Sequence, residues 1–466
     1  MKKSFVLMLV FVLSLSLLLS ACGGGGNKTE EGSKPAAEGD KTNANKPAAE
    51  PAKEEPPADA PKELSGELTI WTFATNTMEP MNAAFTKKYP NVKLNFQILS
   101  WDDMQKNLKT SIAAGNGGPD VAMVEGSFMS TLNTSEGLED LLQAPYNAGD
   151  LKNNWTEGNW NRWLSLDGQK LLGLPWDMPP MATFYRSDIL EENGFPSDPK
   201  ELADYMASEE NFLNMAQALK AKGIYILEGN TTIMDIYTAG NGFFDRSLNY
   251  VRNTDEYAHG LDLAKKVKQL GLSFNNSAFW SDPGKQAVAS GKIAMVYYGP
   301  WILGSIRDAA PESKGKWRTT SLPLGTAAGN GGSTLSILSQ SKNKELAWEY
   351  IRFTLATDEG VQANVDNGGS PGYIPAWSFP TILNYTNDML GDQKPNEIWN
   401  PMTQKIQNIW VQTPLDKDAG DVWNKGITDA IDKNKDSKAA LQQIADDIEK
   451  KVKVAKDELK QKLGVK

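Results

Sequence analysis

From residue 67 onward, apolar and polar residues follow one another in two patterns, one typical of strands and one typical of helices. The segments 67–73 (ELTIWTF) and 92–98 (VKLNFQI) are predicted to be strands, and in the second of them every other side chain is apolar. Between them, Met81 and Phe85 have the spacing of one helix face, and we expect this helix to end at Tyr89, just before a proline. The first part of the pattern is therefore strand, helix, strand.

The alternation continues with a second helix and a third strand. Met104 and Leu108 are spaced as on one helix face, which predicts a helix that begins near Trp101 and ends at Gly115. The segment 121–124 (VAMV) then has the length and composition of a short buried strand. Strands that alternate with helices predict a parallel sheet, and such sheets bind ligands beyond the carboxyl ends of their strands.

A later apolar run ends unusually. Residues 293–298 (IAMVYY) are predicted to form a buried strand, which Gly299 and Pro300 stop abruptly before Trp301. A large aromatic side chain directly after such a break lies in a loop at the end of a strand, where functional residues concentrate. We therefore favour a ligand-contacting role for Trp301 over a place in the core.

The N-terminus has the pattern of an exported protein. An apolar run over 5–19 follows two lysines, and it is shorter than the roughly 20 residues of a membrane-spanning helix. The sequence LSAC at 19–22 resembles the lipobox of bacterial lipoproteins, in which cleavage leaves the cysteine as a lipidated first residue. We expect a signal peptide over 1–21 and a lipidated Cys22; the alternative is a free thiol that follows a signal peptide by chance.

The next segment is expected to be a tether. Residues 22–64 are rich in Gly, Pro, Ala, Glu and Lys and contain almost no large apolar side chain. Such a composition cannot bury a core, and its prolines and charges favour a solvated, partly extended chain. We expect this tether to hold the folded part away from the membrane.

Composition excludes several classes of protein. The 466 residues include 48 Lys and Arg against 58 Asp and Glu, a formal net charge of -10, so no nucleic-acid partner is expected. A chain this long exceeds the roughly 250 to 300 residues of a single core, which predicts at least two lobes. With one Cys and one His, the chain is not expected to form a Cys/His zinc site or a Ser-His-Asp triad. We expect His259 to lie on a helix surface.

No cofactor or metal site is predicted. The glycine-rich turn after the second helix lacks the Lys and Ser/Thr of a phosphate-binding loop. Two acidic stretches, at 416–421 and from Asp432 onward, imitate calcium loops but lack the required Gly and Glu. We expect turns at both places, with Ser437 as the cap of the C-terminal helix.

Several segments together resemble a known family. In order along the chain, they look like the recurrent segments of bacterial extracellular solute-binding proteins of the family-1, maltose-binding type. Together they extend over most of residues 64–466. The segments are AFTKKYPNVKLNFQ, WDDMQKNLKTSIAAGNGGPDV, GLPWDMPPMATFYRSDILEENGFPSDP, SGKIAMVYYGPW and SKNKELAWEYIRF.

The resemblance implies an α/β architecture of the two-lobe, type II periplasmic-binding-protein kind. Each lobe is expected to hold a mainly parallel sheet flanked by helices, and hinge segments are expected to cross between the lobes. The first lobe is predicted over 65–177 and 331–372, and the second over 178–330 and 373–466. A sugar held in the cleft would be delivered to the membrane permease of an ABC-type importer.

Sugar rings present hydroxyls at their edges and C–H groups on their faces, so a sugar site needs aromatic rings and planar polar groups. Trp301 matches the Gly-Pro-Trp tryptophan that stacks on sugar in maltose-binding members of the family. The ends of the predicted strands and crossings supply the other candidates, and core packing is the alternative for Trp71 and Trp176. The predicted ligand-binding residues are Trp71, Phe73, Glu125, Ser127, Trp176, Asp177, Trp301 and Tyr373. Phe243 and Phe244 are weaker candidates and are expected to be packed.

Other functions stay open at this point. Paired acids such as Asp102 and Asp103, or Glu125 and Asp177, would suffice for a secreted, lipid-anchored glycoside hydrolase. A binding protein for a peptide or a polyamine is another alternative. We favour a non-enzymatic, monomeric carbohydrate-binding lipoprotein on the extracellular face of the cell membrane, with a permease as its protein partner.

Overall fold

The computed structural model describes residues 64–73, 78–274, 278–365, 371–406 and 411–464. All of these residues fall in one compact unit. The predicted signal peptide, Cys22 and the predicted tether, apart from Leu64, lie outside the described residues. Within the described residues, no helix has both the length and the apolar composition needed to cross a membrane.

The first sheet has the strand order β2-β1-β3-β8-β4. β1 is parallel to both β2 and β3, whereas β8 is antiparallel to β3 and β4. The three strands predicted first along the chain are confirmed, including their parallel arrangement. The strands are β1 (Gly66–Thr72), β2 (Val92–Ile98), β3 (Val121–Glu125), β4 (Leu174–Pro175) and β8 (Ser333–Ile337).

The second sheet corrects one detail of the predicted fold. Its strands β5 (Ala182–Arg186), β6 (Met295–Tyr298) and β7 (Trp317–Thr320) have the order β6-β5-β7, and both pairings are antiparallel. The expectation of a mainly parallel sheet in this lobe was wrong, because β5 enters directly from the first sheet and runs opposite to both neighbours. The pairing of Tyr225 with Ile293, next to β6, is parallel.

Side chains of this second sheet alternate between two cores. Phe184 of β5 and Val296 of β6 belong to one apolar cluster, whereas Tyr185 of β5 and Met295 of β6 belong to another. The period of two along a strand places these neighbours on opposite faces. Both faces of the sheet are therefore buried, which accounts for the continuous apolar run that predicted β6.

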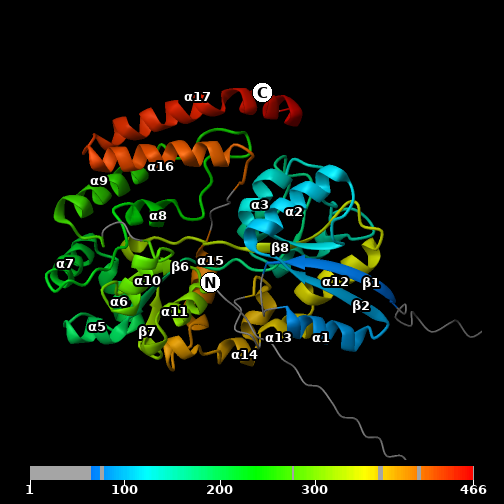
Figure 1. Cartoon of the computed structure of the whole chain (residues 1–466), viewed down its shortest axis with the longest axis horizontal. Helices are drawn as coiled ribbons and strands as arrows, with labels where there is room; N and C mark the ends of the chain where they lie inside the picture. The colour runs from blue at the N-terminus through cyan, green and yellow to red at the C-terminus, as the bar shows by residue number, and fades with distance from the viewer. Residues whose placement is uncertain (1–63, 74–77, 275–277, 366–370, 407–410, 465–466) are drawn as a thin grey trace, which may run out of the picture. The chain divides into compact units, whose positions relative to one another are not determined.

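Helices cover both faces of the first sheet, with α2 and α3 on one side and α1 and α12 on the other (Figure 1). The helices up to β6 are α1 (Glu79–Lys88), α2 (Trp101–Ala114), α3 (Gly126–Leu132), α4 (Glu157–Arg162), α5 (Ser187–Glu192), α6 (Pro199–Met206), α7 (Glu209–Lys220), α8 (Thr232–Thr238), α9 (Asp255–Leu270) and α10 (Asp282–Ala289).

Later helices complete both lobes, and α9, α16 and α17 lie side by side (Figure 1). His259 lies on α9 with an exposed side chain, as predicted. The helices after β6 are α11 (Ile302–Ala309), α12 (Lys344–Ala356), α13 (Asp358–Val365), α14 (Pro380–Leu383), α15 (Asn396–Lys405), α16 (Asp416–Asp432) and α17 (Ser437–Leu463).

Local capping fixes the ends of two of these helices. Ser100 accepts a hydrogen bond from the backbone N–H of Asp103 at the start of α2, and Gly115, with φ 67°, ends it as predicted. The predicted cap of α17 was wrong, because the side chain of Asp436 accepts from the backbone N–H of Ala439. Ser437 instead donates its hydroxyl proton to Asp262 at 2.7 Å.

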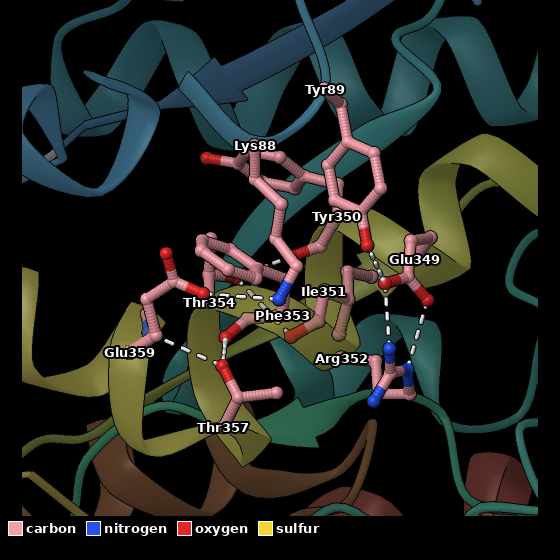
Figure 2. Close-up of polar contacts among 11 residues, drawn as sticks. Lys88, Tyr89, Glu349, Tyr350, Ile351, Arg352, Phe353, Thr354, Thr357 and Glu359 are labelled. Carbon is pink, nitrogen blue, oxygen red and sulfur yellow. Dashed lines mark hydrogen bonds and ion pairs between the residues drawn. The ribbon is translucent and has the colours of Figure 1, made fainter. Parts of the chain in front are cut away.

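A polar cluster joins α1 to α12 on the outer side of the first sheet (Figure 2). The Tyr89 hydroxyl donates to Glu349 at 2.5 Å, and Arg352 donates to the same carboxylate. Burial and the neighbouring carboxylate of Glu349 raise the pKa of Tyr89 to about 12. Tyr350 also donates to Asn82 of α1, at 2.6 Å. These bonds tie α1 to α12, its neighbour on the same face of the sheet.

The apolar core of the first lobe includes residues that follow the predicted boundary at 372. Tyr373, Ala376 and Ile382 are buried in the same cluster as the β1 and β3 side chains. Met389 belongs to a cluster of the second lobe. The chain therefore passes from the first core to the second between Ile382 and Met389.

Candidate ligand-binding site

Two segments that cross between the sheets run side by side and antiparallel. The first leads from β4 to β5, and the second leads from β7 to β8. The backbone N–H of Trp176 donates to the Ser333 carbonyl at 3.0 Å, and the backbone N–H of Met181 donates to the Ala328 carbonyl at 2.8 Å. Residues of both crossings line one cavity of about 1330 Å³, and we call this side of the cavity its floor.

The first lobe supplies one wall of this cavity from the ends of its strands. Phe73 follows β1, while Glu125 and Ser127 lie at the end of β3 and the start of α3. The Glu125 carboxylate caps α3 and accepts hydrogen bonds from the backbone N–H of Ser127, at 2.8 Å, and from its hydroxyl. This wall lies beyond the carboxyl ends of the parallel strands, the edge at which such sheets bind ligands.

Trp101 is a residue of this wall that the sequence interpretation missed. It is 45% exposed, and its ring lies 4.9 Å from that of Phe128. Phe128 in turn meets Phe73 edge to face at 5.9 Å. A usable signal was present, because Trp101 closely follows β2 at the same edge of the sheet as the end of β1.

Asp177 lies at the start of the first crossing and lines the cavity. Its carboxylate accepts the backbone N–H of Ser333, on the second crossing, at 2.7 Å. Burial raises the pKa of Asp177 to about 6, against the opposing effects of the Ser333 N–H and the Arg162 guanidinium. The group is thus a hydrogen-bond acceptor that is close to protonation at mildly acidic pH.

Arg162 is a buried charge behind the cavity. It is 6% exposed, and it donates a hydrogen bond to the carbonyl of Gly331 on the second crossing. Burial lowers the pKa of Arg162, and the carboxylates of Glu125 and Asp177 oppose that shift. Gly332 has φ 113°, and a Cβ atom there would lie 3.0 Å from the guanidinium, so a glycine is needed for this close approach.

Trp301 forms part of the opposite wall. It follows β6 and precedes α11, is 45% exposed, and donates its indole N–H to the Asn330 carbonyl at 3.4 Å. A Cβ atom on Gly299 would lie 2.3 Å from the indole nitrogen. The Gly-Pro break therefore ends the strand, and the missing side chain of Gly299 leaves space for the Trp301 ring at the cavity wall.

Charged residues of the second lobe also line the cavity and were not predicted. These residues are Glu228, Asp235 and Arg252. Glu228 is 7% exposed and accepts hydrogen bonds from the backbone N–H of Phe279, at 2.5 Å, and from the Tyr298 hydroxyl, at 3.1 Å. Burial raises the pKa of Glu228 to about 7.

Six of the eight predicted ligand-binding residues line the cavity, namely Phe73, Glu125, Ser127, Trp176, Asp177 and Trp301. The structure does not bring Trp71 or Tyr373 to it. Trp71 packs against the first core, and Tyr373 is 8% exposed and donates its hydroxyl proton to Asp358 at 3.2 Å. Phe243 and Phe244 pack in the second lobe, as expected.

Comparison with known families settles the class of protein. The family model of bacterial extracellular solute-binding proteins matches residues 72–362 of the chain. The chain belongs to this family. The resemblance seen in the sequence is thereby confirmed.

Two relatives illustrate the family. A lactose-binding protein from Rhizobium radiobacter is 27% identical over 378 residues, which cover 75% of this chain and 83% of the relative. An arabinooligosaccharide-binding protein from Bacillus subtilis is 28% identical over 310 residues, which cover 63% of this chain and 70% of the relative. Both are named as binding proteins.

Solved structures share the two-lobe fold. A sugar-binding protein from Xanthomonas citri superposes with a TM-score of 0.68 at 19% identity, covering 85% of this chain and 100% of that one. An ABC transporter associated binding protein from B. animalis subsp. lactis, in complex with beta-1,6-galactobiose, superposes with a TM-score of 0.65 at 21% identity. The second superposition covers 83% of this chain and 97% of that one. The predicted fold class is confirmed.

The buried carboxyl group of Glu228 leads to a prediction about stability. Its pKa is raised from 4.5 to about 7, so the folded protein holds this proton more tightly than the unfolded chain does. Its contribution to the free energy of unfolding is therefore full below pH 4.5 and falls as the pH rises toward 7. Glu228→Gln keeps an oxygen that accepts both hydrogen bonds and removes the titration.

As the pH rises from 5 to 8, we expect the free energy of unfolding of the unmodified protein to fall by about 2 kcal/mol relative to that of Glu228→Gln. Urea unfolding of both proteins at the two pH values measures this difference. Asp177 titrates in both proteins and cancels in the comparison. Stability curves that run parallel from pH 5 to pH 8 would show that Glu228 does not carry a raised pKa.

Proposed function

We propose that the protein captures an oligosaccharide in the cavity described above and delivers it to an ABC-type importer. The observation that carries the proposal is the pairing of exposed indole rings with acceptor groups in one cavity. Trp101 and Trp301 stand on walls from different lobes, and Asp177, at the floor, offers oxygens to hydroxyl groups. Sugars combine apolar ring faces with hydroxyl edges and need both kinds of group.

Capture follows from the two-lobe construction. In an open form the sugar rests on the aromatic residues of one lobe, and contacts to the other lobe form only on closure. The ligand then shifts an equilibrium between two hinge states because it binds the closed state more tightly. We infer that a permease recognises the closed state. Names of the relatives support a glycosidic ligand of more than one ring, since they include lactose and arabinooligosaccharides.

We infer that the protein is not an enzyme. Membership of a binding-protein family supports this inference, as do the two relatives that are named for binding. The cavity carboxylates of Glu125 and Asp177 already accept backbone N–H groups of the protein, which suits fixed acceptors. We further propose that Cys22 carries the lipid anchor on the extracellular face of the cell membrane and that the protein acts as a monomer.

A panel of oligosaccharides tests the proposed ligand class. Binding to the folded state alone raises the melting temperature, and the shift grows with ligand concentration over the dissociation constant. We expect at least one di- or oligosaccharide to raise the melting temperature by several degrees, whereas spermidine and a short peptide leave it unchanged. Release of reducing ends from the bound sugar would point to a hydrolase. A shift with spermidine and with no sugar would contradict the carbohydrate proposal.

Trp301 provides the test at residue level. If Trp301 is a buried aromatic anchor in the complex, Trp301→Ala should weaken binding of the best sugar by about 1 to 4 kcal/mol. Gly299→Ala should also weaken binding, because the added Cβ displaces the Trp301 ring. Calorimetric affinities are compared with melting temperatures of the ligand-free proteins, and Val454→Ala on the exposed face of α17 serves as the control. Normal affinity with a much lower melting temperature would assign Trp301 to the core.

The anchor has its own test. We expect the Cys22→Ser protein to be released from the membrane fraction or to keep its signal peptide, because Cys22 is the single cysteine of the chain. Fractionation of expressing cells, followed by immunoblotting, measures this. A version that starts at Leu64 should keep the sugar affinity, since the tether composition cannot contribute a core. Unchanged membrane attachment of Cys22→Ser would rule out lipidation at this residue.

A further inference from the structure

Trp280 is a second exposed indole of the second lobe, and the sequence did not single it out. It is 50% exposed, and its ring stacks on that of Trp301 with centroids 5.8 Å apart and planes 21° apart. Tyr298 meets both indoles edge to face, with ring centroids 5.7 Å from each. Trp301 lines the cavity. Trp280 thus touches the ring that faces the ligand space.

The backbone around Trp280 is held on both sides. Phe279, which precedes it, is fully buried and donates its N–H to Glu228. Ser281, which follows it, caps α10 by accepting the N–H of Gly284 at 3.2 Å. A Cβ atom on Gly284 would lie 2.0 Å from the Ala278 carbonyl oxygen, so the turn closes tightly over this glycine. Trp280 is therefore exposed on a fixed segment.

Glu228 connects this segment to the end of β6. One carboxylate oxygen accepts from both the Phe279 N–H and the Tyr298 hydroxyl. The bond from the Phe279 N–H holds the backbone next to Trp280. The bond from the Tyr298 hydroxyl holds the ring that contacts both indoles. A single buried acceptor therefore holds both the backbone next to Trp280 and the Tyr298 ring that contacts the two indoles.

We propose that Trp280 is a positioning residue for the sugar: it covers one face of the Trp301 indole and holds the other face toward the cavity. This inference rests on the proposed function, in which Trp301 contacts the ligand. An exposed tryptophan with no neighbour samples several rotamers, and binding has to order it. A ring already stacked on its neighbour avoids that loss of entropy.

The test uses the mature folded chain and the sugar with the largest thermal shift. We expect Trp280→Ala to raise the dissociation constant about tenfold and to leave the melting temperature of the ligand-free protein unchanged. Trp280→Phe should restore most of the affinity, because a smaller ring still covers Trp301. In the Trp301→Ala background, Trp280→Ala should have no further effect. Val454→Ala is the control for loss of an exposed apolar side chain.

A spectroscopic readout accompanies the affinities. Stacked indoles couple electronically, so the near-ultraviolet circular dichroism of the ligand-free protein should contain a signal that is lost equally in Trp280→Phe and Trp301→Phe. Equal affinities of Trp280→Ala and the unmodified protein would overturn the inference while leaving the proposed function intact. Additive losses in the double variant would overturn it as well and would place Trp280 in direct contact with sugar. Absence of binding to any sugar would overturn the inference and the proposed function together.

Discussion

The site depends on one constraint, the tie between two chain segments that cross from one sheet to the other. Asp177 on the first crossing accepts the N–H of Ser333 on the second, and Arg162 donates to the carbonyl of Gly331. A hydrogen bond to a charged group contributes about 1.5 to 3 kcal/mol, so both bonds resist separation of the segments that they join. The crossings therefore have a defined spacing, and both walls of the cavity are built outward from them.

The two walls obtain their aromatic residues in different ways. In the first lobe, Phe73 and Trp101 follow the ends of parallel strands, where backbone direction alone brings them to one edge. In the second lobe the sheet is antiparallel, and Trp301 reaches the cavity because Gly299 and Pro300 end β6 sharply. The buried acceptor Glu228 then orders the neighbouring rings. The second wall therefore depends on specific hydrogen bonds as well as on chain direction.

The parts of this arrangement that local chemistry determines could be predicted from the sequence. The ends of α2 follow from Ser100 and Gly115, and the position of Trp301 follows from the break before it. Family resemblance added the crossings between the two lobes and, with them, Trp176 and Asp177 as candidate cavity residues. Contacts between distant segments were not predictable: Trp280 meets Trp301 across 20 intervening residues of chain. The same holds for the antiparallel pairing of β5 and for Tyr373, whose surroundings come from other parts of the first core.

The central claim is that the cavity holds a sugar against Trp301 with its hydroxyls turned toward the crossings. A crystal structure of the protein with the oligosaccharide that gives the largest thermal shift tests it most directly. The account predicts a pyranose or furanose ring parallel to the Trp301 indole, with hydroxyls within hydrogen-bond distance of Asp177 or Glu125. A sugar bound outside this cavity, or bound inside it with Trp301 turned into the core, would contradict the account.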